Sequence, residues 1–189
     1  MSSSIHILGF SGSLRKDSYN RAALRLARQI ALEYENVEFE IIDLDNIPLF
    51  NQDLENDPPE AVHIFKEKIR HADALFMTVP EYNYSFSGVL KNAIDWASRP
   101  LATSPLPRKL TAIMGAGGRV GTERAQLHLR QVFLYLDIQA ITKPEVLILN
   151  SWEKFDSEGN LTNEKDRQQI ETLVEVLIRQ ARERKQIGL

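Results

Sequence analysis

Residues 5–20 read IHILGFSGSLRKDSYN, and this stretch decides the fold. The apolar run Ile5 to Phe10 predicts a buried strand, which passes directly into a segment rich in glycine, serine and cations. Apolar residues then recur at helical spacing, at positions 23, 26, 27 and 30. A buried strand that leads through a short polar loop into an amphipathic helix is the repeating unit of a parallel sheet.

The same alternation continues to the end of the chain. Four more apolar runs predict strands, at Val37 to Asp43, Ala74 to Val79, Leu110 to Met114 and Val146 to Leu149. Segments with helical spacing lie between and after them, at about 62–72, 88–98, 122–136 and from 162 or 163 onward. The sequence therefore predicts an α/β fold in which a five-stranded parallel sheet is covered by helices on both faces.

Length and charge narrow the class of protein. A chain of 189 residues with 43% hydrophobic side chains can bury one good core, so residues 1–189 are expected to form a single domain. The 23 Lys and Arg residues against 26 Asp and Glu residues are scattered along the chain and leave a formal charge of −3. This balance argues against a nucleic-acid partner and against a polybasic membrane patch.

The chain contains no cysteine, which excludes disulfides, thiolate nucleophiles, cysteine-ligated zinc and iron–sulfur clusters. Any redox chemistry must therefore come from a bound organic cofactor. The sequence begins without a signal-like segment, and no apolar stretch reaches the ~18 residues of a membrane span. The expected location is the cytoplasm, with no membrane association.

The loop after the first strand has the composition of an anion-binding loop. It offers backbone N–H groups at the start of a helix, hydroxyl and amide donors, and a cation. The candidate donors are Ser13, Arg15, Ser18 and Asn20. The loop has neither the Walker A ending nor the GxGxxG dinucleotide fingerprint. An ordinary capped turn, with Arg15 solvated, remains the alternative.

Two further loops follow the third and fourth strands. Residues 80–88 are rich in aromatic and amide side chains that could lie along a flat heterocycle, although they could also form a rigid turn that packs on neighbouring helices. Residues 115–121 contain four glycines, which allow close approach to a ligand or a sharp turn. Because ligands bind beyond the carboxyl ends of parallel strands, one molecule could contact all three loops.

Four motifs carry a resemblance to a known family. They are GSLR at 12–15 with Ser18 and Asn20, PEYN at 80–83, LKNAIDW at 90–96 followed by SRP at 98–100, and the glycine-rich segment 115–121. Over essentially its whole length the chain resembles the NADPH-dependent FMN reductases, which are flavodoxin-like quinone, chromate and azo-dye reductases. The resemblance implies a flavodoxin-like three-layer fold with the strand order 2-1-3-4-5.

The resemblance also implies an FMN site built from matching positions. The FMN phosphate would be held by Ser13, Arg15, Ser18 and Asn20. The isoalloxazine and the ribityl chain would be lined by Pro80, Glu81, Tyr82 and Asn83, with backbone contacts from Gly117 and Gly118. At one position the chain departs from the family: Ser87 precedes Gly88 where a proline is common, and this change is expected to loosen the start of the following helix.

The implied function is that of an FMN-containing oxidoreductase. NADPH or NADH would donate a hydride, and quinones, free flavin or other small acceptors would receive two electrons by a ping-pong mechanism. No catalytic acid or base is assigned, because the cofactor carries the chemistry. A flavodoxin-like electron carrier is the alternative, but a charge of −3 does not supply a strongly acidic face. A binding module without redox function is a second alternative.

Two remaining features concern metals and partners. The four histidines are scattered in sequence, and no pair has i, i+4 spacing beside an acid, so no metal is assigned. The helix expected at 88–98 has a second apolar side, formed by Val89 and Trp96. This side would face a partner subunit in a homodimer or homotetramer, as the family's dimers suggest, or would be covered by a neighbouring loop.

Overall fold

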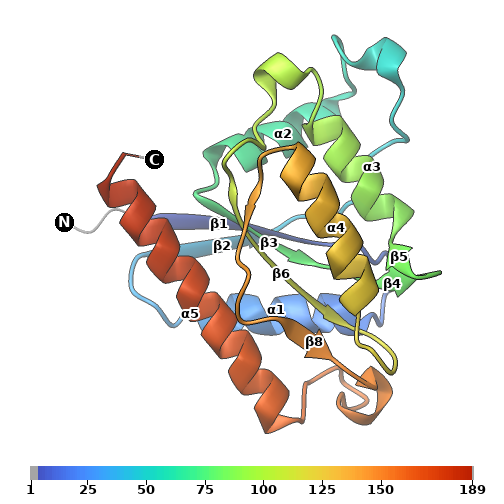
Figure 1. The fold of residues 1–189 in the computed structure, drawn as a ribbon, viewed down its shortest axis with the longest axis vertical. Coiled ribbons are helices and arrows are strands. Elements are labelled where there is room, and N and C mark those ends of the chain that lie inside the picture. The colour runs from blue at the N-terminus through green and yellow to red at the C-terminus, as the bar shows by residue number, and fades with distance from the viewer. Residues whose placement is uncertain (1–3, 189) are drawn as a thin grey trace.

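The computed structural model describes residues 4–188, which form a twisted parallel sheet between two layers of helices (Figure 1). The sheet runs in the order β2 (Val37–Ile41), β1 (Ile5–Ser11), β3 (Ala74–Thr78) and β6 (Leu110–Ala116). Two short strands, β7 (Gln139–Ala140) and β8 (Val146–Ile148), pair with β6 on its other side. The predicted order 2-1-3-4-5 is thereby confirmed.

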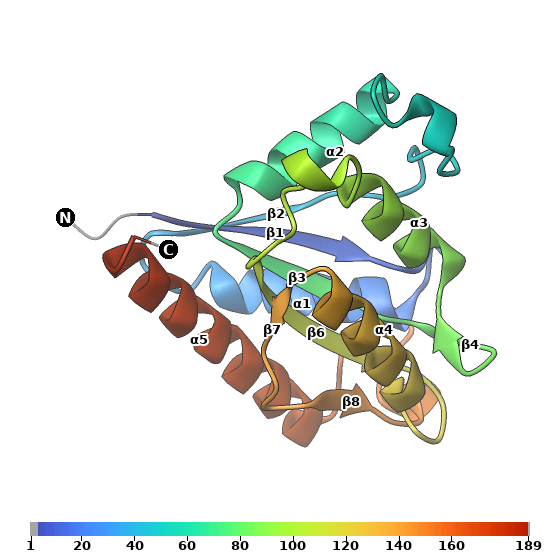
Figure 2. The same cartoon turned by 45° about the horizontal axis from the view of Figure 1, so that its top comes forward.

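Helices cover both faces of the sheet. Figure 2 shows α1 (Tyr19–Ala31) and α5 (Glu164–Gln186) on one side of it. The other side carries α2 (Glu60–His71), α3 (Gly88–Ala97) and α4 (Glu123–Tyr135). Each side has its own apolar cluster, and strands β1, β3 and β6 contribute side chains to both. Burial on both faces explains why these strands are continuous apolar runs.

The fifth position of the sheet is divided between two strands. Strand β7 pairs with the first two residues of β6, and β8 pairs with its last three residues. Pro144 lies between them and has no amide hydrogen to donate to a neighbouring strand, which is one reason the ladder is interrupted here. The sequence predicted β8 within one residue and missed β7.

A small hairpin after β3 was also absent from the prediction. Strands β4 (Glu81–Tyr82) and β5 (Ser85–Phe86) pair antiparallel across a two-residue turn. The turn residues Asn83 and Tyr84 have φ angles of 50° and 67°. Positive φ at both central positions is the geometry of the tight turn that suits the twist of a hairpin.

The expected loosening at Ser87 is wrong. The Ser87 hydroxyl accepts a hydrogen bond from the Leu90 N–H at 3.2 Å and donates one to the Gly12 carbonyl at 2.7 Å. Serine is among the preferred residues at this capping position because it satisfies an N–H group that has no partner inside the helix. The substitution therefore caps α3 and joins it to the loop after β1.

Trp96 does not lie on a free surface of α3. It is only 1% exposed, its ring meets Phe50 edge-on with centroids 5.0 Å apart, and its indole N–H donates to the Pro48 carbonyl at 2.8 Å. The loop that carries Pro48 and Phe50 covers this side of the helix. The interpretation of Trp96 as a partner-facing residue is therefore wrong, and the alternative of a covering loop describes the structure.

Candidate functional site

The loops after β1, β3 and β6 meet at one edge of the sheet. Ser11 is in register with Thr78, and Thr78 with Met114, so the three strands end side by side. Beyond the strands, the Gly12 N–H donates to the Thr78 carbonyl at 2.9 Å. The three loops that the sequence singled out for ligand binding therefore form one continuous surface.

Asn20 joins two of these loops. Its Nδ2 donates to the Ala116 carbonyl at 2.8 Å, and its Oδ1 accepts from the Ala116 N–H at 3.0 Å. The side chain is buried, and it connects the first turn of α1 to the end of β6 across 96 residues of sequence. Asn20 was predicted as a phosphate donor, but the structure uses both ends of its amide to position the site.

The other three residues of the first loop lie in different environments. Ser18 caps α1, because its hydroxyl accepts from the Arg21 N–H at 3.4 Å. Ser13 is buried, yet its hydroxyl makes no hydrogen bond to any residue of 4–188. Arg15 is exposed, with its guanidinium carbon 5.5 Å from the centroid of the Tyr19 ring. Ser13 and Arg15 are thus available to a ligand.

The backbone between these residues supplies further donors. Within the described chain, the N–H groups of residues 14–17 donate no hydrogen bond. These groups precede the N-terminus of α1, where the helix dipole favours negative charge. The loop contains one carboxylate, Asp17, which is exposed. This set of donors fits a phosphate group.

The second loop is held in place by an ion pair. Glu81 accepts from Arg124 Nη1 at 2.9 Å and from the Ala125 N–H at 3.2 Å, so both carboxylate oxygens are engaged. The guanidinium of Arg124 also lies 3.8 Å from the centroid of the Tyr84 ring. These contacts fix the β4–β5 hairpin against the start of α4. Glu81 consequently has a structural role and is not a free base.

The remaining predicted residues of this loop differ in exposure. Pro80 is buried and packs beside the loop after β1, where a Cβ on Gly12 would lie 2.9 Å from the proline ring. Tyr82 is 52% exposed, and Asn83 is exposed at the tip of the hairpin. The exposed Tyr82 and Asn83 thus form the outer part of this loop, and the buried Pro80 forms its inner part.

The third loop needs its glycines for two different reasons. A Cβ on Gly117 would lie 2.1 Å from the Gly121 carbonyl oxygen, so no side chain fits there. Both backbone groups of Gly117 are already used, by the Ile148 carbonyl and by Ser151. A Cβ on Gly118 would meet only Trp152, at 4.0 Å. Gly118 therefore offers open space to a ligand, whereas Gly117 shapes the loop.

The loop after β8 belongs to the same edge, and the sequence interpretation missed it. The Asn150 N–H donates to the Gly118 carbonyl at 2.9 Å. Its side-chain Oδ1 is buried without a hydrogen-bond partner in the described chain. The neighbouring Trp152 is 56% exposed. The rule that ligands bind beyond the carboxyl ends of parallel strands would have found this loop if it had been applied to the fifth strand as well.

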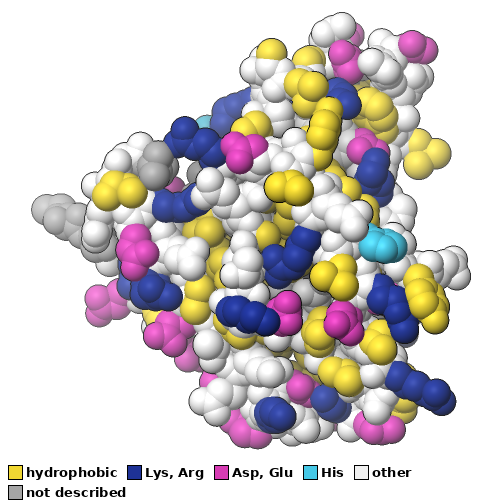
Figure 3. Space-filling view, in the orientation of Figure 1, with side chains coloured by type: hydrophobic (Ala, Val, Ile, Leu, Met, Phe, Trp, Pro, Cys, Tyr) yellow, Lys and Arg dark blue, Asp and Glu magenta, His cyan; other side chains and the backbone are white. Residues whose placement is uncertain are grey.

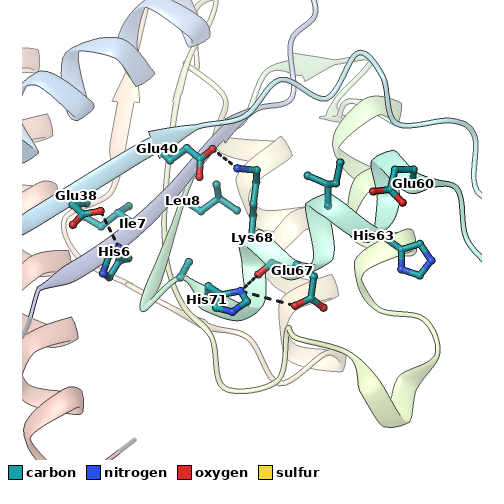
Figure 4. Close-up of a pocket in the computed structure, with 12 residues that line it drawn as sticks. His6, Ile7, Leu8, Glu38, Glu40, Glu60, His63, Glu67, Lys68 and His71 are labelled. Atoms are coloured by element: carbon teal, nitrogen blue, oxygen red, sulfur yellow. Dashed lines mark hydrogen bonds and ion pairs between the residues drawn. The ribbon is translucent and has the colours of Figure 1, made fainter.

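A separate hollow lies away from this edge, between α2 and the β1–β2 side of the sheet (Figure 4). Three of the four histidines line it, namely His6, His63 and His71, so these residues are gathered in space although they are scattered in sequence. Glutamates surround them, and Glu38 lies 3.2 Å from the His6 ring nitrogen. No three such side chains within residues 4–188 are placed to hold a metal ion.

Residues 5–153 match the family described as NADPH-dependent FMN reductase. The chain belongs to this family. The match includes every predicted site residue from Ser13 to Gly118, and it ends before α5. The NADPH-dependent FMN reductase family was the one that the sequence motifs indicated, and that prediction is confirmed.

Named relatives within the family are similar over nearly the whole chain. An NAD(P)H-dependent FMN reductase of Pseudomonas aeruginosa is 49% identical over 179 residues, which cover 94% of this chain and 95% of the relative. An NAD(P)H:quinone oxidoreductase of Solanum tuberosum is 43% identical, with coverages of 90% and 89%. The solved structure of FerB, a flavoenzyme NAD(P)H:(acceptor) oxidoreductase from Paracoccus denitrificans, superposes with a TM-score of 0.82 at 31% identity, covering 95% and 98% of the two chains.

Proposed function

We propose that residues 1–189 form one FMN-binding domain that oxidises NADPH or NADH and reduces quinones, free flavin or other small acceptors. The observation that carries this function is the edge where the three loops meet. This edge combines the free N–H groups of residues 14–17, the exposed Arg15 and the open space at Gly118. The chain also belongs to an FMN reductase family. The protein is an oxidoreductase, as its family and its relatives indicate.

The residues present fit FMN. The N–H groups of residues 14–17, the Ser13 hydroxyl and Arg15 would hold the phosphate. The rim formed by residues 80–83 and Gly118 would receive the ring system. Asn20, Ser18 and Gly117 would support this site from behind, because their polar groups are already engaged within the protein.

Bound FMN would supply the chemistry, by accepting a hydride and passing two electrons to an acceptor. The chain's own contribution is to bind and orient. Glu81 and Arg124 hold the hairpin, and both carboxylate oxygens of Glu81 are engaged in this contact. The buried Pro80 and the exposed Tyr82 shape the space into which the nicotinamide and the acceptor would come in turn.

The function predicts a yellow protein whose pigment, released on denaturation, is FMN on chromatography. NAD(P)H alone should bleach the flavin absorbance in a stopped-flow experiment before any acceptor is added. Because one open surface serves both substrates, varying NAD(P)H at several acceptor concentrations should give parallel double-reciprocal lines. Intersecting lines would indicate separate sites, and a pigment that NAD(P)H cannot bleach would favour the electron carrier.

Arg15→Ala should weaken FMN binding by roughly 1.5–3 kcal/mol while hardly changing riboflavin binding. Arg15 is exposed beside the unpaired N–H groups, and riboflavin has no phosphate for it to contact. Titration of both ligands into the apoprotein measures the difference. Arg25→Ala is the matched control, since Arg25 is an exposed arginine further along α1. Equal losses for FMN and riboflavin would place Arg15 away from the phosphate.

The electron-carrier alternative would favour a strongly acidic face on the protein. Figure 3 shows Lys and Arg side chains interspersed with Asp and Glu on the face it presents. No helix in the described part of the chain is long and apolar enough to cross a membrane. A location in the cytoplasm, where NAD(P)H is supplied, and assembly as a homodimer or homotetramer remain proposals that rest on the function and on the family resemblance.

A further inference from the structure

A second polar cavity lies at the opposite end of the sheet from the flavin loops. It has a volume of about 570 Å³ and opens where β3 and β6 begin, beside the last turn of α5. Five Lys and Arg side chains line it: Arg70, Arg108, Lys109, Arg184 and Lys185. Strand β6 has seven residues, so this cavity is roughly 20 Å from the loops at the other end. Figure 3 shows Lys and Arg side chains gathered near the C-terminal end of α5.

Two of these cations have carboxylate partners. Arg70 forms an ion pair with Glu67, and Lys185 contacts Asp73 at 2.9 Å. Asp73 is the one carboxylate that lines the cavity itself. After these pairs are assigned, the charges of Arg108, Lys109 and Arg184 have no carboxylate within contact distance in residues 4–188.

Two of the three remaining cations, Lys109 and Arg184, are held by backbone carbonyls. Lys109 Nζ donates to the Ala72 carbonyl at 2.6 Å, and Arg184 Nη1 donates to the Arg108 carbonyl at 2.8 Å. The Arg108 guanidinium has no acceptor within hydrogen-bond distance among the described residues. The carbonyls orient Lys109 and Arg184 without cancelling their charge. Among the described residues the cavity therefore has more cations lining it than carboxylates, since Asp73 stands against five Lys and Arg side chains.

Burial and mutual repulsion both act on these groups. Desolvation lowers the pKa of Lys109, the attraction of Asp73 opposes this shift, and repulsion from Arg70 makes a smaller contribution that lowers the pKa. Desolvation also lowers the pKa of Arg184, followed by repulsion from Arg108. Arg184 and Arg108 are therefore two like charges held close together, and an anion bound between them would reduce their repulsion.

Favourable interaction with the dipole of α5 explains only some of the cations that line the cavity. Arg184 and Lys185 lie in the last turn of α5, where cations offset the partial negative charge of the helix end. Arg108 and Lys109 belong to no helix, since they directly precede β6. Arg108 even adopts a φ of 62°, a conformation in which its carbonyl meets Arg184. The loop thus brings two further cations to a helix end that is already positively charged.

We propose that this cavity is a binding site for a small polyanion with closely spaced phosphate groups, separate from the flavin site. Pyrophosphate is the simplest molecule with this chemistry. Its two phosphates could be shared between the arginine pair and Lys109, and the cavity volume is within the range of small-ligand pockets. Guanidinium groups suit phosphate because they donate two parallel hydrogen bonds.

The test uses the FMN-loaded protein, so that the phosphate loop of the flavin site is already filled. Isothermal titration calorimetry with sodium pyrophosphate should show one saturable site that weakens as salt is raised. Arg108→Gln and Arg184→Gln should each raise the Kd about tenfold, which corresponds to about 1.4 kcal/mol. NADH oxidation should be unchanged in both variants, which shows that they are folded. Orthophosphate should bind more weakly than pyrophosphate, because it can bridge fewer of the cations.

Arg179→Gln is the matched control, because Arg179 lies on the same helix, pairs with Glu183 at 3.6 Å and does not line the cavity. Its Kd should equal that of the unmodified protein. The proposal is overturned if the FMN-loaded protein shows no saturable binding, or if Arg179→Gln loses as much affinity as Arg108→Gln. It is also overturned if pyrophosphate binds only after FMN is removed, because the ligand would then occupy the flavin loop.

Discussion

Trp96→Ala is expected to lower the free energy of unfolding by roughly 3–5 kcal/mol, which is the usual cost of truncating a buried aromatic residue. Trp96 is 1% exposed, it packs edge-on against Phe50, and its indole N–H donates to Pro48. The mutation leaves a cavity and removes one of the two donors to that carbonyl, which keeps its hydrogen bond from Asn92 Nδ2 at 2.8 Å. Urea unfolding followed by circular dichroism measures the loss.

Trp152→Ala is the control for this experiment. Trp152 is 56% exposed, and its indole N–H contacts only the adjacent Glu153, at 3.2 Å. Its removal should change stability by less than about 1 kcal/mol. A small loss for Trp96→Ala together with weakened self-association in sedimentation would restore the partner-facing interpretation of α3.

Asn20→Ala should destabilise the protein without bound FMN by roughly 2–4 kcal/mol. The mutation leaves both the N–H and the carbonyl of Ala116 without partners in a buried position, and each such group costs about 1–3 kcal/mol. Thermal or urea unfolding of the apoprotein checks the effect. Asn20→Asp should cost at least as much, because it places a buried carboxylate oxygen against the Ala116 carbonyl.

Ser13→Ala provides the contrast within the same loop. The Ser13 hydroxyl has no hydrogen-bond partner in residues 4–188, so its loss should leave the apoprotein's stability almost unchanged and weaken FMN binding. A loss of apoprotein stability equal to that of Asn20→Ala would show that Ser13 has a structural role as well. If Asn20→Ala were fully stable without FMN, its contacts with Ala116 would not matter energetically.

The sheet could be predicted because its buried strands are continuous apolar runs in the sequence. Residues 74–78 are buried without exception, and a continuous apolar run between polar loops has few other interpretations. The carboxyl ends of such strands must lie together, so the meeting of the three loops followed from the fold. The family motifs then added the cofactor, which no periodicity could name.

Contacts between distant residues could not be predicted from spacing. Asn20 bonds a residue 96 positions away, and Arg124 meets a carboxylate 43 positions away. Polar side chains in a loop show the same composition whether they bind a ligand or brace the backbone. For that reason Asn20 and Glu81 were assigned to the ligand, although the structure engages both of them within the protein.

The same limitation applies to surfaces. Helical spacing shows that the side of α3 with Trp96 is apolar, but it does not show what covers that side. The structure shows that the loop of residues 47–50 covers it. The histidines illustrate the opposite case. They are far apart in sequence, and the pairing of β1 with β2 beside α2 gathers three of them around one hollow.

The bonds that join the loops at the flavin edge have a thermodynamic consequence. Gly12 is tied to Thr78 and Ser87, and Asn20 to Ala116, by contacts internal to the protein. A ligand that arrives at a frame already fixed in this way orders little additional backbone, so less conformational entropy is lost on association. For the same reason the apoprotein is expected to reconstitute with chemically modified flavins that retain the phosphate.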